Sequence, residues 1–223
     1  MKRKLIIFFI VLAVILISIY LFLWVYDYYS QQEQVVSNYT LSPEEISSLH
    51  DGDIILRHGY GFVSDMIVKT LNDSTGISHC AIITQYKGHW IVIQSVSSTL
   101  SDVDGVQWQD LNTFIRQSKK NSVVVMRYRH GKNDSDLARI GARAKYYLDK
   151  KIPFDNAFNL FDSTSFYCSE ILWNVFKDEY HVDIFESKYR PEHYDYMKFD
   201  TFLDTSNFKV IFDHRKRIKK FYQ

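Results

Sequence analysis

The chain has 223 residues, of which 46% are hydrophobic and 24% charged, and this composition excludes an intrinsically disordered protein. Its 27 Lys and Arg residues balance 26 Asp and Glu residues, so it lacks the strongly basic character of a typical nucleic-acid-binding domain. Two cysteines are too few for a disulfide-rich scaffold or a four-thiolate zinc site. The length suits one compact domain with an appendage.

Residues 5–26 form an apolar segment without a charged side chain. A helix of this length matches the hydrocarbon thickness of a bilayer, about 30 Å. Three cations lie within residues 1–4, whereas Asp27 and Glu33 follow the segment, and this asymmetry predicts a cytoplasmic N-terminus with the remainder outside the cytoplasm. A cleaved signal peptide is the alternative, but its apolar region is usually shorter and ends in small residues. We therefore expect an uncleaved anchor.

The sequence divides into four parts on this basis. Residues 1–4 are a cytoplasmic tip, residues 5–26 a transmembrane anchor, residues 27–40 a polar tether and residues 41–223 a single exported domain. A bacterial periplasm or cell exterior is the most economical compartment for that domain, and the bilayer is the partner of the anchor.

The patterns of the exported domain predict short helices and strands in alternation. In chain order we expect a helix over 42–49, a strand over 53–56, a helix over 62–71, strands over 79–84 and 90–96, a strand over 123–128, and helices over 134–148 and 167–176. A turn at Lys87-Gly88 joins the two middle strands as a hairpin, and the tail from Tyr189 has no clear pattern. This order predicts an α+β fold, a small antiparallel sheet with helices on one side.

Cys168 lies where a helical pattern begins, in Tyr167-Cys168-Ser169. A cysteine at a helix N-terminus has a lowered pKa because it meets the positive end of the helix dipole and free backbone N–H groups. The same N–H groups, with Tyr167 and Ser169 as candidates, could stabilise an oxyanion. The position therefore suits a nucleophile.

The hairpin places a histidine and an amide on one face of the predicted sheet. A turn at Lys87-Gly88 pairs Ala81 with Gln94, and directly opposed residues share a face. His79 shares the face of Ala81 because side chains alternate along a strand, so Gln94 could orient the imidazole as the third member of a triad. By the same alternation Cys80 points to the other face, away from a reaction site at His79.

Each of these residues also has a purely structural interpretation. A free cysteine is usually buried and inert, a strand histidine can be a core residue, and in an oxidising compartment Cys80 and Cys168 could form a disulfide. Asp53 is a candidate support for the site, although capping a turn is its simpler role. No metal-binding motif appears, so we expect neither a metal nor an organic cofactor.

Three motifs give the chain a resemblance to a known family: Gly52-Asp-Ile-Ile-Leu-Arg57, Ser78-His-Cys-Ala-Ile-Ile83 and Phe166-Tyr-Cys-Ser-Glu-Ile-Leu172. Together they resemble the YiiX/YaeF-like permuted papain-fold amidases, of the circularly permuted NlpC/P60 superfamily. The resemblance implies a permuted papain-like fold with Cys168 as nucleophile and His79 as base, and it places a polar residue at Gln94. Relatives often carry an acidic residue there, whereas a neutral Gln94 orients the imidazole without stabilising its cation.

Together with the predicted anchor, the resemblance implies a membrane-anchored cysteine hydrolase that cleaves an amide bond, in a peptide or a cell-envelope amide, through a thioester intermediate. Two alternatives stay open. Lecithin–retinol-acyltransferase-like enzymes share the permuted plan, so the chain could be a lipid acyl hydrolase or acyltransferase. It could also be a non-catalytic binding module that kept the fold.

Overall fold

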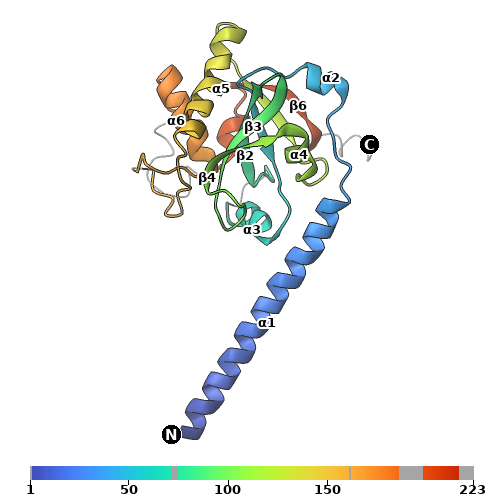
Figure 1. Cartoon of the computed structure of the whole chain (residues 1–223), viewed down its shortest axis with the longest axis vertical. Coiled ribbons are helices and arrows are strands. Elements are labelled where there is room, and N and C mark those ends of the chain that lie inside the picture. The colour runs from blue at the N-terminus through green and yellow to red at the C-terminus, as the bar shows by residue number, and fades with distance from the viewer. Residues whose placement is uncertain (1, 72–74, 161, 186–197, 216–223) are drawn as a thin grey trace.

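A computed structural model describes residues 2–71, 75–160, 162–185 and 198–215. A long helix α1 leads into a domain of helices packed around one sheet (Figure 1). The helices are α1 (Lys2–Val35), α2 (Pro43–Ser47), α3 (Phe62–Leu71), α4 (Leu111–Arg116), α5 (Asp134–Asp149), α6 (Cys168–Tyr180) and the 3-10 helix η3 (Asp200–Leu203). The strands are β1 (Ile54–Arg57), β2 (His79–Tyr86), β3 (His89–Val96), β4 (Gly105–Asp110), β5 (Val124–Tyr128) and β6 (Phe208–Asp213).

The six strands form one antiparallel sheet in the order β4-β3-β2-β1-β5-β6. This arrangement confirms the α+β class. It also places β2, which begins with His79, in the middle of the sheet. The predicted helix over 62–71 is α3 without a change of boundary, and the other predicted elements differ by a few residues at their ends.

Both faces of the sheet are covered, so the expectation of helices on one side was wrong. One face packs on α5 and α6, which lie together at the left in Figure 1, and the other on α4 and the segment before β1. The reason lies in the central strands, whose residues are apolar at successive positions: Ile54, Ile55 and Leu56 are all fully buried. Such continuous apolar runs are typical of strands buried on both faces.

Four elements were not predicted from the sequence: β4, α4, η3 and β6. β4 and β6 are the two edge strands of the sheet, and edge strands carry mixed, half-exposed residues that give a weak pattern. β6 lies in the tail that had no clear pattern. Residues 189–197 of that tail lie outside the described residues.

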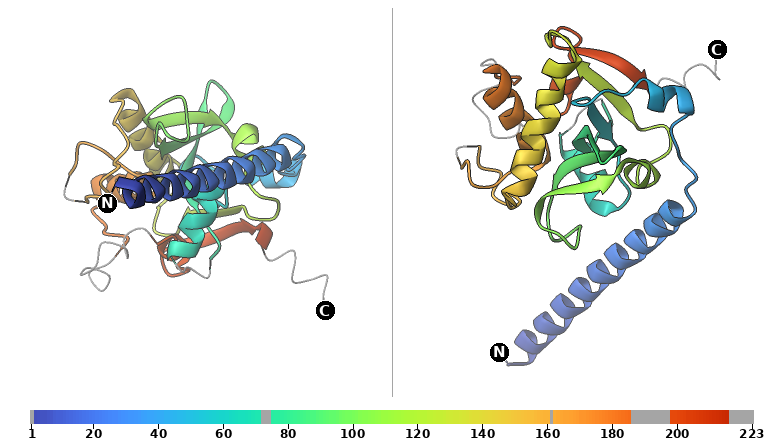
Figure 2. Two further views of the ribbon diagram at one scale, coloured as in Figure 1. Left: turned by 90° about the horizontal axis from the view of Figure 1, so that it is seen from below. Right: turned by 45° about the horizontal axis from the view of Figure 1, so that its top comes forward.

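α1 is a single helix that continues beyond its apolar segment to Val35. Its length and a mean hydropathy of 3.3 over the most apolar window make it a candidate membrane span, among the described residues the only one. Residues 27–35, which we expected within a tether, are helical and reach the domain (Figure 2). Only the short stretch before α2 remains as an extended link.

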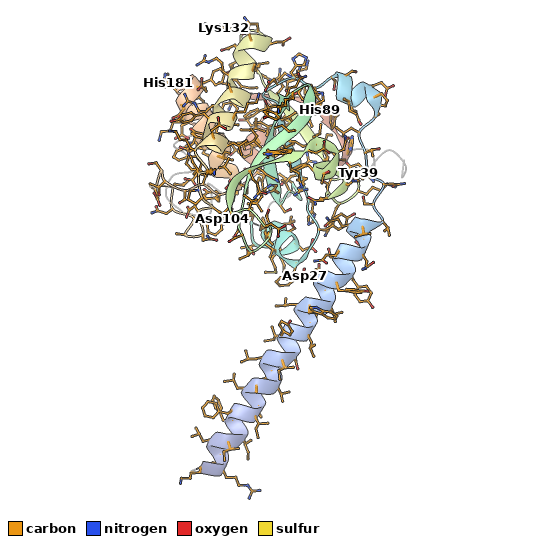
Figure 3. The ribbon with its side chains drawn as sticks, in the orientation of Figure 1. Asp27, Tyr39, His89, Asp104, Lys132 and His181 are labelled. Atoms are coloured by element: carbon orange, nitrogen blue, oxygen red, sulfur yellow. The ribbon has the colours of Figure 1, made fainter. Side chains whose placement is uncertain are left out.

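The C-terminal part of α1 docks on the start of α3 (Figure 3, near Asp27). The Asp27 carboxylate accepts the backbone N–H of Phe62 at 2.9 Å, and the Ser30 hydroxyl accepts that of Gly61 at 2.7 Å. Tyr26 hydrogen-bonds to Asp65 of α3 and its ring packs edge-on against Phe62. α1 therefore provides capping acceptors for the first turn of α3, which has free N–H groups.

Candidate active site

Cys168 is the first residue of α6, as the sequence predicted to within one residue. The residue before it, Tyr167, is extended and buried, with 2% of its surface exposed. The Tyr167 N–H donates to Oε2 of the Glu170 carboxyl group at 3.2 Å. This bond closes the helix start and leaves the Cys168 side chain at the positive end of the helix dipole.

The hairpin register is the expected one, and it brings His79 and Gln94 together. Tyr86 pairs with His89 across the turn, where Lys87 and Gly88 both have positive φ angles of 51° and 79°. This is the turn geometry that suits the twist of a hairpin. His79 Nε2 lies 2.7 Å from Gln94 Oε1, so the second ring nitrogen of His79 is left for the thiol.

Two further glutamines continue this hydrogen-bond chain. The Gln94 Nε2 amide donates to Gln109 Oε1 at 3.3 Å, and Gln109 Nε2 donates to Gln117 Oε1 at 2.8 Å. Because Gln94 uses its NH₂ group here, its oxygen faces His79 and accepts a hydrogen bond from the Nε2 N–H. Sequence reasoning missed both residues, although the alternation Gln107-Trp108-Gln109 was a signal for a strand with one polar face.

The surroundings of Cys168 lower the pKa of its thiol well below the usual range. The causes are a hydrogen bond from the Cys80 side chain, a hydrogen bond to His79, the positive charge of His79 and the Ser169 backbone N–H, which together outweigh burial. Each of these interactions favours the thiolate. The arrangement can therefore hold a nucleophilic thiolate beside an imidazolium.

Cys80 lies closer to this site than strand alternation suggested. Its side chain is on the opposite face from His79, as expected, but α6 covers that face. The Cys80 thiol therefore lies against the first residue of α6, and its single S–H proton is shared between the Cys168 backbone carbonyl, at 3.1 Å, and the Cys168 sulfur. Burial and the neighbouring Cys168 raise the pKa of Cys80, so it stays a neutral donor. Both cysteines are free thiols, and no disulfide joins them.

The two neighbours of Cys168 differ in what they offer an oxyanion. The Ser169 backbone N–H interacts with the Cys168 sulfur, and the Ser169 hydroxyl is buried without a hydrogen-bond partner among the described residues. The Tyr167 N–H is already bonded to Glu170. Burial raises the pKa of Glu170 to about 8, so this carboxyl adds little negative charge beside the thiolate at neutral pH.

Asp53 lies in a separate polar cluster at the start of β1. Its carboxylate accepts two hydrogen bonds from Arg127, at 2.7 and 2.8 Å, and one from the His50 N–H at 2.8 Å. Only 1% of its surface is exposed. None of these partners touches Cys168, His79 or Gln94 in the described part of the chain, so Asp53 joins the turn before β1 to β5.

Two cavities meet at His79. One, of about 240 Å³, contains Cys168 and is mostly apolar. Its apolar walls are Val63, Ile67, Leu71, Val96, Leu100, Phe154, Phe158, Tyr167 and Phe199. The other, of about 250 Å³, contains Arg57 and Gln117 and extends to Asp27 and Gln34 of α1, and it shares Ser78, Val63, Ile67, Val96 and Leu100 with the first. An extended substrate could therefore lie across the thiol with a different chemical environment at each end.

A metal centre is not evident in the described ranges, where no three His, Cys, Asp or Glu side chains gather closely enough to hold an ion. The candidate chemistry is that of a thiol and an imidazole.

Comparison with known proteins gives the family. A family model described as "Permuted papain-like amidase enzyme, YaeF/YiiX, C92 family" matches residues 48–194. A crystal structure titled as the metalloprotein yiiX from Escherichia coli O157:H7 has a similar fold, with a TM-score of 0.57 and 19% sequence identity over 74% of this chain and 98% of that one. No curated protein matches the chain. The chain belongs to the YaeF/YiiX family of permuted papain-like amidases, and it is a cysteine amidase.

Proposed function

We propose that the chain is a membrane-anchored amidase whose domain lies outside the cytoplasm and whose nucleophile is Cys168. The observation that carries the proposal is the junction of α6 with the β2–β3 hairpin, where a thiol of lowered pKa lies beside an imidazole that Gln94 holds at 2.7 Å. A thiol, an imidazole and an orienting amide are the components of a cysteine hydrolase.

The proposed reaction has two steps. The Cys168 thiolate attacks the amide carbonyl, a C–S bond forms, and His79 gives its proton to the nitrogen as the C–N bond breaks. A water molecule, deprotonated by His79, then adds to the thioester and releases the acid and the thiol. Backbone N–H groups at the start of α6, that of Ser169 among them, stabilise the oxyanion in both steps.

Amides of peptides or of the cell envelope are the substrates that the family and the proposed compartment favour. The apolar cavity beside Cys168 also supports a second candidate, an acyl hydrolase or acyltransferase that acts on lipids. Both form the same acyl-enzyme, and they differ in the group that leaves and the group that accepts the acyl chain. A non-catalytic binding module forms no acyl-enzyme.

Acylation of Cys168 tests the mechanism directly. We expect the full chain in detergent, mixed with p-nitrophenyl hexanoate, to acquire one hexanoyl group on Cys168, because an activated ester drives the first step even when the natural leaving group is unknown. Peptide mass mapping locates the group, and neutral hydroxylamine removes it if it is a thioester. Cys168→Ala should abolish the modification, whereas Cys80→Ala should retain it on Cys168. A modification on Cys80, or no modification together with no Cys168-dependent release of p-nitrophenolate, would contradict the proposed nucleophile.

Labelling in intact bacteria tests the orientation. In a full chain with Cys80→Ala and Cys168→Ala, the exposed Lys132 of the domain (labelled in Figure 3) or Lys4 of the N-terminal tip is replaced by cysteine. We expect a membrane-impermeant maleimide, once past the outer membrane, to label the Lys132→Cys chain and to spare the Lys4→Cys chain until the cells are lysed. The reverse pattern would refute the orientation. A domain that has lost residues 1–26 would indicate a signal peptide.

A further inference from the structure

Arg57 brings a positive charge next to the candidate site. It is the last residue of β1 and pairs with His79 of β2. Directly opposed residues of an antiparallel pair point to the same face, and both residues line the cavity of about 250 Å³ that also contains Ser78 and Gln117. Arg57 therefore lies directly opposite His79 on the neighbouring strand, on the same face of the sheet.

The guanidinium of Arg57 has no carboxylate partner among the described residues. It donates from Nη1 to the Phe114 carbonyl at 2.9 Å and lies 3.9 Å from the centre of the Phe114 ring. Its buried Nε has no hydrogen-bond partner in the described part of the chain. Burial without a counter-charge lowers the pKa of Arg57 to about 9.

An uncompensated buried cation costs stability, and proteins usually pair it or neutralise it. The ion pair between Arg127 and Asp53 shows the usual arrangement in this same sheet. A cation left unpaired in a cavity beside a catalytic imidazole is instead suited to a ligand that brings the anion. Guanidinium groups bind carboxylates with strong and directional hydrogen bonds.

The two cavities differ in which catalytic residue they contain, and this assigns the ends of the substrate. The apolar cavity contains both Cys168 and His79, so it suits the acyl group that becomes bonded to sulfur. The Arg57 cavity contains His79 but not Cys168. Because His79 protonates the leaving amine in the proposed function, the leaving amine belongs on the Arg57 side.

We infer that Arg57 binds a carboxylate carried by the leaving amine, so that the substrates are apolar acyl amides of an amino acid with a free carboxylate. The inference rests on the proposed function for its assignment of the two cavities. In the reaction the amide C–N bond breaks, the C–S bond to Cys168 forms, and the amino acid leaves with the proton from His79. Water then releases the apolar carboxylic acid.

Protection of Cys168 from iodoacetamide measures binding at this site without requiring turnover. The ligands are N-hexanoylglycine and its neutral match N-hexanoylglycinamide, which differ only in the carboxylate, and the protein is the full chain in detergent. We expect the carboxylate ligand to protect Cys168 at a concentration at least tenfold lower than the carboxamide. Arg57→Gln should remove this difference, and Arg57→Lys should keep part of it because the charge remains.

The control is Arg116→Gln, which removes an exposed arginine of α4, and it should leave the tenfold preference intact. If Arg57→Gln weakens protection by both ligands equally, Arg57 only supports Phe114 and the inference fails. Equal protection of the wild type by both ligands overturns it as well. A phosphonate, N-hexanoylaminomethylphosphonate, serves as a third ligand, and tenfold better protection by it than by the carboxylate would assign the cavity to a phosphate group instead.

Failure of the proposed function gives a different pattern. In that case p-nitrophenyl hexanoate leaves Cys168 unmodified, although protection by the carboxylate ligand can still be scored at alkaline pH, where any thiol is alkylated. Thermal melting of each variant verifies that it is folded before protection is compared.

Discussion

Iodoacetamide should alkylate Cys168 well below neutral pH, and replacing His79 by alanine should slow this low-pH reaction by about 100-fold. Only the thiolate reacts, and an ordinary thiol with a pKa of about 8.5 is about 0.3% thiolate at pH 6. The lowered pKa of Cys168 means that its thiolate persists to lower pH than that of an ordinary thiol, and it is lost as the pH falls through that lowered value. Peptide mass mapping of the alkylated full chain against pH measures the effect for each cysteine.

The controls for this experiment separate the His79 interaction from general damage. His89→Ala removes an exposed histidine at the hairpin and should leave the profile unchanged. Gln94→Ala should shift the profile partway, because His79 remains but its ring is no longer held. Cys80 should react slowly at every pH, since it is buried and its pKa is raised. A Cys168 profile that titrates like a free thiol and ignores His79 would exclude the ion pair.

The largest expected effect on stability is that of Asp53→Ala. The Asp53 side chain is 99% buried, and its removal leaves Arg127 without an ion-pair partner. Breaking a buried ion pair in this way costs about 3–5 kcal/mol of stability. For a domain of this size the melting temperature should fall by about 10 °C. Thermal unfolding of the full chain in detergent, followed by intrinsic fluorescence, provides the measurement.

The same variant decides between the two roles of Asp53. If its role is structural, the alkylation profile of Cys168 should match that of the wild type at temperatures where the variant is folded. A shifted profile in folded protein would make Asp53 a support of the site. Asp149→Ala, at an exposed position on α5, is the matched control and should change stability by less than about 0.5 kcal/mol.

Local patterns in the sequence were sufficient for the hairpin and for the start of α6. A two-residue turn at Lys87-Gly88 determines the register, and the register determines that Gln94 meets His79. The hydrogen-bond chain from Gln94 to Gln109 and Gln117 depends on the pairing of β4 with β3. The loop between these strands has no turn motif from which their register could be predicted. The position of Arg57 opposite His79 could not be predicted either. α3 and its flanking loops separate β1 from β2 in the sequence, so no short turn determines how these two strands pair.

Cys80 shows the limit of reasoning from alternation alone. The period of two placed its side chain correctly on the face opposite His79. It could not show that α6 packs on that face with its first residue over the start of β2, where one thiol can bond to the carbonyl of the other cysteine. Which helix covers which face is a property of the whole fold, and no local pattern records it.

The docking of α1 on α3 has a consequence for how the enzyme meets its substrates. Because α1 is continuous, it limits the distance between the membrane and the domain: residues 27–35 rise only about 14 Å beyond the apolar segment. Asp27 and Gln34 of this part of α1 line the Arg57 cavity. With α1 across the bilayer and Cys168 as the nucleophile, both as proposed, the reaction takes place within a thin layer next to the headgroups. The enzyme then meets substrates that are attached to the membrane surface by lateral diffusion in the plane of the bilayer. Amides that lie farther from the membrane do not reach the thiol.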